Sequence, residues 1–117
     1  MLPCDRPAAL TGLATLYATF ATAEEAARIG RAMVERELAA CVNILAPCTS
    51  IYRFEGQVAE AREVPALFKT RADLAGPLIA AIAAAHSYRT PAIVAWFDDA
   101  CHPATASWVE AETGAGN

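Results

Sequence analysis

The chain has 117 residues, of which 56% are hydrophobic and 19% are charged, and its formal net charge is −4 at pH 7. This length fits one domain, the composition excludes a disordered chain, and the acidic balance argues against a nucleic-acid partner bound through its phosphates. The hydrophobic fraction is high for a free monomer, so we expect some apolar surface to be buried between subunits.

The start of the chain and the cysteines indicate the compartment. Residues 1–7 contain no apolar stretch of the kind found in an export signal, and no apolar run reaches the ~18–20 residues of a membrane helix. Four widely spaced cysteines form no CxxC pattern, which is typical of free thiols in a reducing compartment: Cys4, Cys41, Cys48 and Cys101. We therefore expect a cytoplasmic protein with neither a membrane nor a nucleic-acid partner.

The first part of the chain predicts a strand, a helix and a second strand. Residues 13–20 form a short apolar run that is typical of a buried strand. Thr22 followed by Glu25 matches a capping box, which opens a helix. The predicted inner face of this helix carries apolar and small residues at helical spacing: Ala26, Ile29, Gly30, Met33 and Val34. Residues 41–45 predict the next strand, which Pro47 interrupts.

An aromatic hairpin is expected next. From Ser50 onward, strand alternation places Tyr52 and Phe54 on one face. Glu55-Gly56 predicts a tight turn, because glycine supplies the positive φ that such turns need. The return strand covers residues 57–69. Pro65 cannot donate a ladder hydrogen bond, so we expect an edge, a bulge or a break there.

The last part of the chain predicts a helix, a strand and a short terminal helix. The second helix is expected to begin near Ala72 or Asp73, with Asp73 as N-cap, and to end at His86. Its predicted inner face is formed by Leu74, Leu78, Ile82 and Ala85. Residues 92–97 predict the fourth main strand, and residues 104–112 predict the terminal helix.

The order of elements is β-α-β-β-α-β, which is typical of a ferredoxin-like α+β sandwich. We expect an antiparallel sheet with both helices on one face, in a single domain covering residues 13–113. Residues 1–12 and 114–117 are expected to be tails. The face without helices would carry Tyr52 and Phe54. Such an apolar face must be covered, and association of subunits would cover it.

Three segments resemble the CutA family of divalent-cation tolerance proteins. They are the run LAACVNILAPCTSIYRFEG at residues 38–56, the pair Lys69-Thr70, and His86-Ser87-Tyr88 with Pro91. The resemblance spans roughly residues 15–108. It implies a ferredoxin-like subunit that assembles as a homotrimer and takes part in divalent-cation tolerance.

The resemblance also implies a metal site at His86, which is a ligand in some members of the family. An imidazole suits copper or zinc. Cys41, in the family's Ala-Cys-Val-Asn run, would be a strong ligand as a thiolate, or else a small buried hydrophobe. His86 could equally be a helix-terminal residue bonded to a carbonyl group. Phe20, Ala85 and Ala92 stand where some members have Cys, His and Glu.

A second candidate metal site follows the fourth main strand. Cys101 and His102 come shortly after the acidic pair Asp98-Asp99. Thiol, imidazole and carboxylate groups within five positions could hold a soft cation. The alternative is a solvated turn with incidental side chains.

Two further functions are consistent with the sequence. Lys69 and Tyr88 could hold a small anion or a nucleotide in clefts between subunits, as in the related trimeric PII signalling proteins; alternatively, Lys69 pairs with an acid. The chain could also be a trimeric scaffold for partner docking. We expect no enzyme activity, because there is no HExxH motif, no Ser-His-Asp order and no cleft pattern of paired carboxylates.

Overall fold

The computed structural model describes residues 11–114. Most of the two expected tails, at residues 1–12 and 114–117, therefore lies outside the described residues. No helix in the described range is long and apolar enough to cross a membrane.

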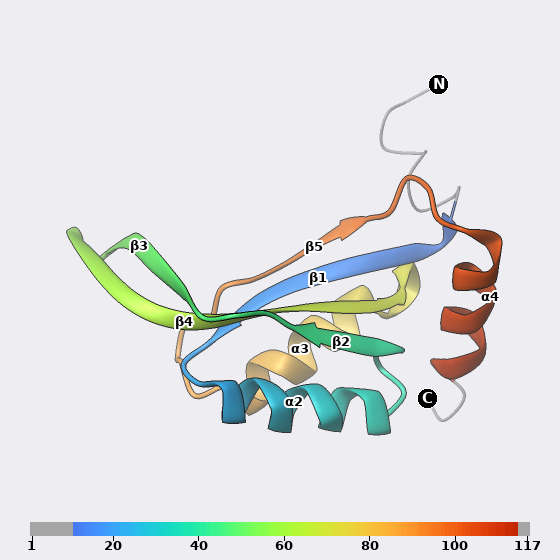
Figure 1. The fold of residues 1–117 in the computed structure, drawn as a ribbon, viewed down its shortest axis with the longest axis horizontal. Coiled ribbons are helices and arrows are strands. Elements are labelled where there is room, and N and C mark those ends of the chain that lie inside the picture. The colour runs from blue at the N-terminus through green and yellow to red at the C-terminus, as the bar shows by residue number, and fades with distance from the viewer. Residues whose placement is uncertain (1–10, 115–117) are drawn as a thin grey trace.

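A single antiparallel sheet forms the centre of the subunit (Figure 1). Its path is β2-β4-β1-β5, with β3 pairing with the far half of β4. The strands are β1 (Leu13–Phe20), β2 (Cys41–Ile44), β3 (Cys48–Phe54), β4 (Gln57–Arg71) and β5 (Ile93–Phe97). β4 pairs with β1, β2 and β3, so it connects the whole sheet. The β3–β4 hairpin projects beyond the body of the subunit in Figure 1.

Two helices cover one face of the sheet, α2 (Ala23–Glu35) and α3 (Ala75–Ala85), and α4 (Pro103–Glu112) lies at one end of it (Figure 1). The uncovered side is called the open face below. The expected α+β architecture, with an antiparallel sheet and both long helices on one side, is confirmed.

The hydrophobic core lies between the sheet and these helices. Alternate residues of β1 are fully buried and point toward the helices: Ala14, Leu16, Ala18 and Phe20. The helices contribute Ile29, Met33, Leu78 and Ile82, each at most 1% exposed. Burial of one large apolar side chain stabilises the fold by roughly 1.5–3 kcal/mol. This core holds the sheet against the two helices and thereby sets the positions of the loops at the ends of the strands.

Two residues of the predicted helix faces are not buried. Val34 is 36% exposed, and Ala85 is also exposed. Both lie at the carboxyl ends of their helices. The other predicted inner-face residues are buried, as expected.

The helix starts were predicted with mixed success. Thr22 Oγ1 accepts a hydrogen bond from Glu25 N at 3.0 Å, as a capping threonine should. The second helix begins later than predicted, at Ala75, after the 3₁₀ turn η2 (Ala72–Leu74). Asp73 is not its N-cap, because the Arg71 guanidinium donates two hydrogen bonds to its carboxylate, at 2.9 and 2.6 Å. Such a bidentate charged pair is stronger than a neutral cap.

The backbone conformation confirms the predicted hairpin turn and shows how β4 accommodates Pro65. Glu55 and Gly56 have φ values of 52° and 78°, as a two-residue hairpin turn requires. β4 runs unbroken through Pro65, whose carbonyl accepts from Leu45 N at 2.9 Å. The N and O atoms of a strand residue point to the same side, so the missing donor faces the gap between β2 and β3. The interruption expected at Pro65 therefore lies not in β4 but opposite it, between the end of β2 at Ile44 and the start of β3 at Cys48.

Candidate functional site

The side chain of His86 is fully buried where α3 meets the sheet. Its Nε2 lies 2.8 Å from Thr19 O, and its Nδ1 accepts a hydrogen bond from Tyr88 N at 3.0 Å. Because Nδ1 accepts this bond, Nε2 carries the hydrogen that it shares with Thr19 O. The ring also stacks on Phe20, with centroids 4.9 Å apart. Both nitrogens are therefore used inside the protein, and neither offers a free lone pair.

Glu25 joins the start of α2 to the loop after α3. It is 7% exposed, and its carboxylate accepts from Ser87 N at 2.7 Å and from Ala21 N at 3.2 Å. Burial acts to raise the pKa of Glu25, but hydrogen bonds from Ser87 and Ala21 and the nearby His86 together lower that pKa below its usual value. The sequence indicated Glu25 as part of a cap, whereas its link to Ser87 was not predicted.

Cys41 lies far from His86. In the strand register, Cys41 on β2 lies opposite Lys69 on β4, and Lys69 lies opposite Thr15 on β1. His86, in contrast, contacts Thr19 on β1. Thr15 and Thr19 are four positions apart on β1, which is about 13 Å along a strand. Burial raises the pKa of the Cys41 thiol, against the opposing effect of Lys69. The structure therefore does not bring these two predicted ligands together in one subunit.

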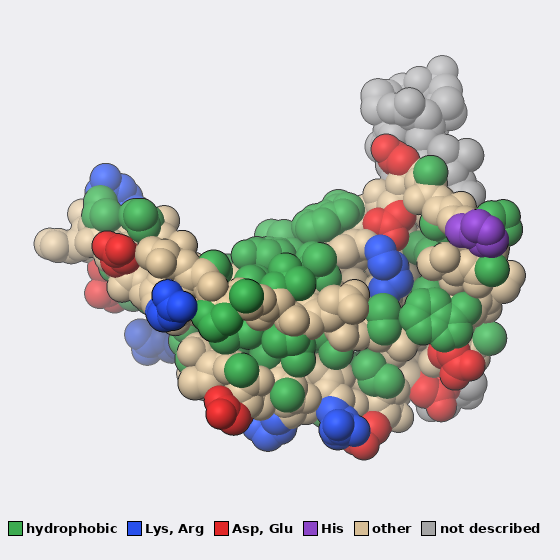
Figure 2. All heavy atoms as spheres, in the orientation of Figure 1, with side chains coloured by type: hydrophobic (Ala, Val, Ile, Leu, Met, Phe, Trp, Pro, Cys, Tyr) green, Lys and Arg blue, Asp and Glu red, His purple; other side chains and the backbone are tan. Residues whose placement is uncertain are grey.

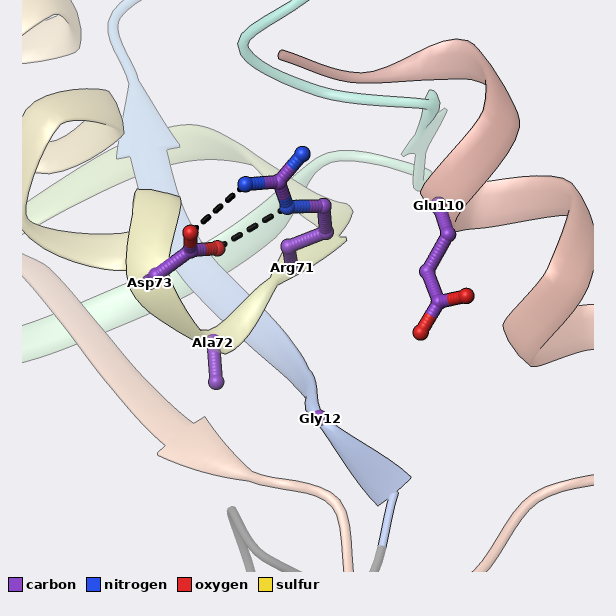
Figure 3. A pocket seen from close by; sticks show the side chains of 5 residues that line it. All are labelled: Gly12, Arg71, Ala72, Asp73 and Glu110. Carbon is purple, nitrogen blue, oxygen red and sulfur yellow. Dashed lines mark hydrogen bonds and ion pairs between the residues drawn. The ribbon is translucent and has the colours of Figure 1, made fainter.

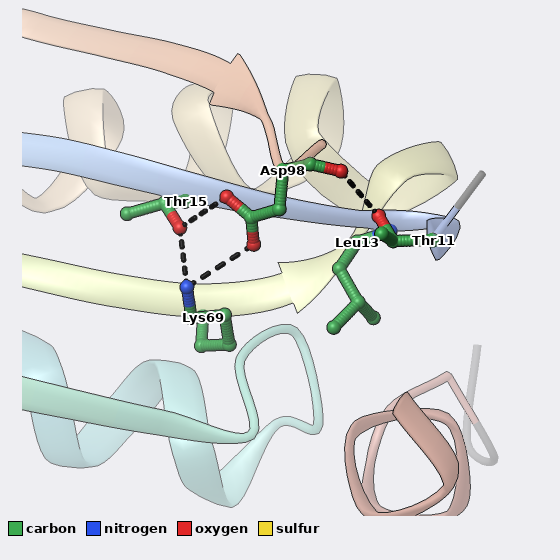
Figure 4. A network of polar contacts seen from close by, with 5 residues as sticks. All are labelled: Thr11, Leu13, Thr15, Lys69 and Asp98. Carbon is green, nitrogen blue, oxygen red and sulfur yellow. Dashed lines mark hydrogen bonds and ion pairs between the residues drawn. The ribbon is translucent and has the colours of Figure 1, made fainter. Parts of the chain in front are cut away.

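Lys69 belongs to a closed polar network on the open face (Figure 4). Its Nζ lies 3.1 Å from Asp98 Oδ2 and also donates to Thr15 Oγ1. Thr15 Oγ1 in turn donates to Asp98 Oδ1 at 2.8 Å. The lysine charge is thus balanced by an acid of the same subunit. Among the two alternatives for Lys69, this geometry favours a structural ion pair.

Tyr88 lies at the opposite end of β1 from Lys69. Burial, followed by a hydrogen bond to Glu63 and the charge of that carboxylate, raises the pKa of Tyr88 to about 12. Glu63 itself is 9% exposed. Lys69 and Tyr88, which were predicted to bind one ligand together, therefore do not form one site within a subunit. Glu63, the neighbour of Tyr88, was not identified from the sequence.

Cys101 and His102 lie together on the surface beside α4. Both are exposed, and His102 Nδ1 accepts from Ala104 N at 3.0 Å, which caps the helix. Within the described residues, His102 Nε2 makes no hydrogen bond. Within residues 11–114, no group of three or more His, Cys, Asp or Glu side chains could hold a metal ion. Cys101 and His102 therefore provide two accessible donors but no complete ligand set.

A hollow beside Arg71 is structural (Figure 3). Its volume is about 410 Å³, and Arg71, Asp73 and Glu110 line it. Arg71 Nη1 also donates to Thr113 O at 3.2 Å, which fastens the end of α4 to β4. The hydrogen bonds to Asp73 raise the pKa of Arg71, against the effect of burial. The charge of Arg71 is therefore already balanced.

A larger hollow, called the open-face hollow below, lies between the β3–β4 hairpin and residues 86–92. Its volume is about 610 Å³. Aromatic and charged side chains line it, among them Tyr17, Tyr52, Phe54, Glu63, Tyr88 and Arg89. The sequence indicated Tyr52 and Phe54 as part of an apolar surface, whereas the presence of Glu63 and Arg89 at the same hollow was not predicted.

Residues 14–112 match the model of the CutA1 divalent ion tolerance protein family. The chain belongs to this family. It is 48% identical over 73 residues to the divalent-cation tolerance protein CutA of Thermus thermophilus, covering 62% of this chain and 71% of that protein. It is 40% identical over 80 residues to the protein of that name from Archaeoglobus fulgidus, covering 68% of this chain and 78% of that protein.

Solved structures of the family share the fold. The divalent cation tolerance protein CutA1 of Thermus thermophilus superposes with a TM-score of 0.84 at 36% identity, covering 87% of this chain and 99% of that chain. The resemblance to the CutA family is thereby confirmed. This CutA chain is a divalent-cation tolerance protein by family.

Proposed function

We propose that this CutA chain acts as a homotrimer of ferredoxin-like subunits, with the open face as the contact between subunits. Exposed apolar side chains on that face support the proposal: Val94 and Trp96 on β5 are 54% and 47% exposed, and Tyr52 and Phe54 on β3 are 44% and 49% exposed. Figure 2 shows hydrophobic side chains gathered on the face toward the viewer. Large exposed apolar patches mark interaction surfaces, and aromatic residues are enriched in interfaces.

The edges of the sheet support the same assembly. β2 and β5 end the path of the sheet, so each has one side without a strand partner among the described strands. An unpaired edge readily accepts a strand from another chain. Contacts between different surfaces of identical subunits close into rings when the rotation allows it, and a ring of three covers every open face in turn.

The assembly can be tested by native mass spectrometry of the untagged protein at micromolar concentration. We expect the mass of three subunits. Trp96→Glu should reduce the trimer while circular dichroism retains the subunit signal, because a carboxylate would be buried in an apolar contact. Arg28→Ala, on the exposed side of α2, is the matched control and should leave the trimer unchanged. A monomeric mass for the unmodified protein would contradict the proposal.

We further propose that copper or another divalent cation binds through Cys101 and His102 rather than through His86 and Cys41. The observation that favours this site is the free donor atoms: Cys101 is exposed and His102 Nε2 is not used, whereas both nitrogens of His86 are bonded within the protein. Imidazole and thiolate together suit copper and zinc.

Metal uptake distinguishes the two sites. Zn²⁺ is the first probe because it has no redox chemistry with thiols, and Cu²⁺ follows. In native mass spectra we expect one bound ion per subunit, lost in Cys101→Ser and in His102→Ala. Cys48→Ser, which changes a thiol elsewhere in the chain, should bind as the unmodified protein does. Uptake that survives both changes at Cys101 and His102 would rule out this site.

A further inference from the structure

The projecting part of the β3–β4 hairpin has no third strand beside it among the described strands. Residues 48–54 pair with residues 57–63, whereas β1 and β2 pair with β4 only from Val64 and Ala66 onward. A two-stranded ribbon is at best marginally stable in water by itself. The hairpin that extends from the body of the subunit (Figure 1) would therefore be stabilised by a contact with another chain.

One face of this hairpin is not on the open face. Strand residues alternate between the two faces of a sheet, so Val58, Glu60 and Arg62 share the side of Val64, which packs into the core beneath the helices. Ile51 lies opposite Glu60 and belongs to the same side. This side is called the outer face of the hairpin. Contact between open faces would leave it uncovered.

The outer face is apolar and basic. Ile51 and Val58 are 70% and 67% exposed, the highest values among the large hydrophobic residues of the described chain. Arg53 lies opposite Val58 on this face, and Arg62 lies nearer the body of the subunit. Both arginines are exposed, and neither forms a salt bridge with a described residue. Such a surface suits an apolar partner that carries acidic groups.

A surface of that kind lies at the other end of the subunit. A hollow of about 410 Å³, called the α4 hollow below, lies between the carboxyl end of α2 and α4. Val34 and Trp108 supply its large apolar side chains and are 36% and 43% exposed. Three acids also line the hollow, with no basic residue among the lining side chains: Glu35, Glu37 and Glu112.

The two surfaces lie too far apart to meet within one chain. The hairpin and α4 are at opposite ends of the subunit (Figure 1). The outer face of one subunit can therefore meet only the α4 hollow of another subunit. A contact between two different surfaces of identical chains is directional, and repeated contacts of this kind close into a ring when the rotation allows it.

We propose that the outer face of the hairpin of one subunit packs into the α4 hollow of the next subunit of the trimer. Ile51 and Val58 would lie against Trp108, and the two arginines of the outer face would pair with the glutamates of the hollow. The proposal rests on the trimer proposed above and adds a second contact to it. A second copy of the chain is the favoured occupant because its charges complement those of the hollow.

Charge reversal tests the pairing of the two surfaces. The hairpin variant carries Arg53→Glu and Arg62→Glu, and the hollow variant carries Glu35→Arg and Glu112→Arg. Sedimentation velocity in increasing urea measures how readily each trimer dissociates. We expect either variant to raise the dissociation constant at least about tenfold, which is about 1.4 kcal/mol. The reason is that a ring of three contains three such contacts, and like charges would face each other in all of them.

The variant with all four changes should regain the stability of the unmodified trimer, because the reversed charges match again. All four residues are exposed in the subunit, so the fold should persist in circular dichroism. Arg28→Glu with Arg31→Glu makes the same change of charge on the exposed side of α2. This matched control should dissociate as the unmodified protein does.

Trp108 reports on the contact directly. The chain has two tryptophans, so Trp96→Phe leaves Trp108 as the single fluorescent tryptophan. Acrylamide should quench it weakly in the trimer, since the hairpin of the neighbouring subunit would cover the ring. Adding the two hairpin changes should remove this protection, at a protein concentration where the native mass spectrum still shows three subunits.

The outcomes separate this contact from the trimer itself. A trimer in which the charge-reversed variants dissociate as the control does overturns the contact and leaves the trimer in place. Equal quenching of Trp108 with and without the hairpin changes does the same, and would mean that both surfaces are free in the assembly. A monomeric mass for the unmodified protein overturns the trimer and this contact with it.

Discussion

His86 and Glu25 hold the loop that connects α3 to β5. His86 bonds Thr19 O and Tyr88 N, and Glu25 bonds Ser87 N and Ala21 N. These contacts join the end of β1, the start of α2 and the end of α3 at one point. Because this loop also lines the open-face hollow, the two residues fix the position of that wall.

The first prediction concerns the two histidines of the chain. His86→Ala should lower the free energy of unfolding by about 3 kcal/mol, because it leaves a cavity and removes two buried hydrogen bonds. His102→Ala removes only an exposed helix cap, so its effect should be about 1 kcal/mol or less. Urea denaturation of both variants gives the comparison. Equal losses of stability would mean that the burial of His86 contributes little.

The second prediction is a pH dependence caused by Glu25. Its pKa in the folded protein lies below the ordinary value of 4.5. A lowered folded pKa means that the stabilisation is complete above the unfolded pKa and is lost as the pH falls through the folded pKa. The free energy of unfolding should therefore fall as the pH drops below about 4.5. Glu25→Gln should be less stable at neutral pH by about 1–3 kcal/mol and should show a weaker acid dependence.

Denaturant titrations of both proteins between neutral and acidic pH check this expectation. Glu24→Gln, at the neighbouring exposed position, is the control and should follow the unmodified protein. Parallel curves for Glu25→Gln and the unmodified protein would contradict the role given to this carboxylate.

At the scale of elements, α2 lies close to the sheet because of Gly30. A Cβ atom added at Gly30 would lie 2.8 Å from Val42 Cγ1 on β2, closer than such atoms can approach. Val42 is half-buried and has a branched side chain with little freedom to move. The absence of a side chain at Gly30 thus sets how closely the helix and the strand pack.

The third prediction compares two helical glycines. Gly30→Ala should reduce the free energy of unfolding by about 1–3 kcal/mol, since it overpacks the contact with Val42. At Gly76 nothing beyond the chain neighbours lies within 4 Å of an added Cβ, and the gain in helix propensity in Gly76→Ala is opposed by Pro77, which disfavours helical backbone at a preceding residue with a Cβ. The free energy of unfolding should therefore change by less than about 0.5 kcal/mol in Gly76→Ala. Urea denaturation of both variants gives the comparison. If Gly30→Ala proved stabilising, the close approach would not limit the packing.

At the scale of the whole molecule, exposed aromatic and aliphatic side chains such as Tyr52, Val94 and Trp96 lie on the open face, whereas the opposite face is covered by α2 and α3. A subunit of this kind buries one side of its sheet by folding, and it can bury the other side only by association. Stability and assembly should therefore be coupled.

The fourth prediction follows from that coupling. If folding and trimer formation are linked, the melting temperature should rise with protein concentration, because association draws the folded subunit out of the unfolding equilibrium. Differential scanning calorimetry at several concentrations measures the rise. Trp96→Glu should show a lower melting temperature and a weaker dependence on concentration. A melting temperature that is independent of concentration would argue for a subunit that is stable on its own.

The sequence by itself determined the class of the fold, the approximate limits of most elements and most of the buried face of each helix. These features depend on neighbours within a few positions, such as the cap at Thr22 or the turn at Gly56, and on periodicity. It also carried the motifs by which the chain resembles its family. The predicted order β-α-β-β-α-β has two strands between the long helices, where the structure has three, β2, β3 and β4. Predictions failed at Asp73, where a neighbouring arginine competed for the carboxylate, and at the helix ends.

Only the tertiary structure decided which functional groups meet. The partner of His86 is 67 positions away in the chain, and the Ser87 amide that Glu25 binds is 62 positions away. In the folded chain Lys69 forms an ion pair with Asp98, and Tyr88 lies near Glu63. Cys41 lies far from His86. Such pairings depend on strand register and on how helices lie on the sheet, and both are set by burial of the whole core rather than by any local pattern of residues.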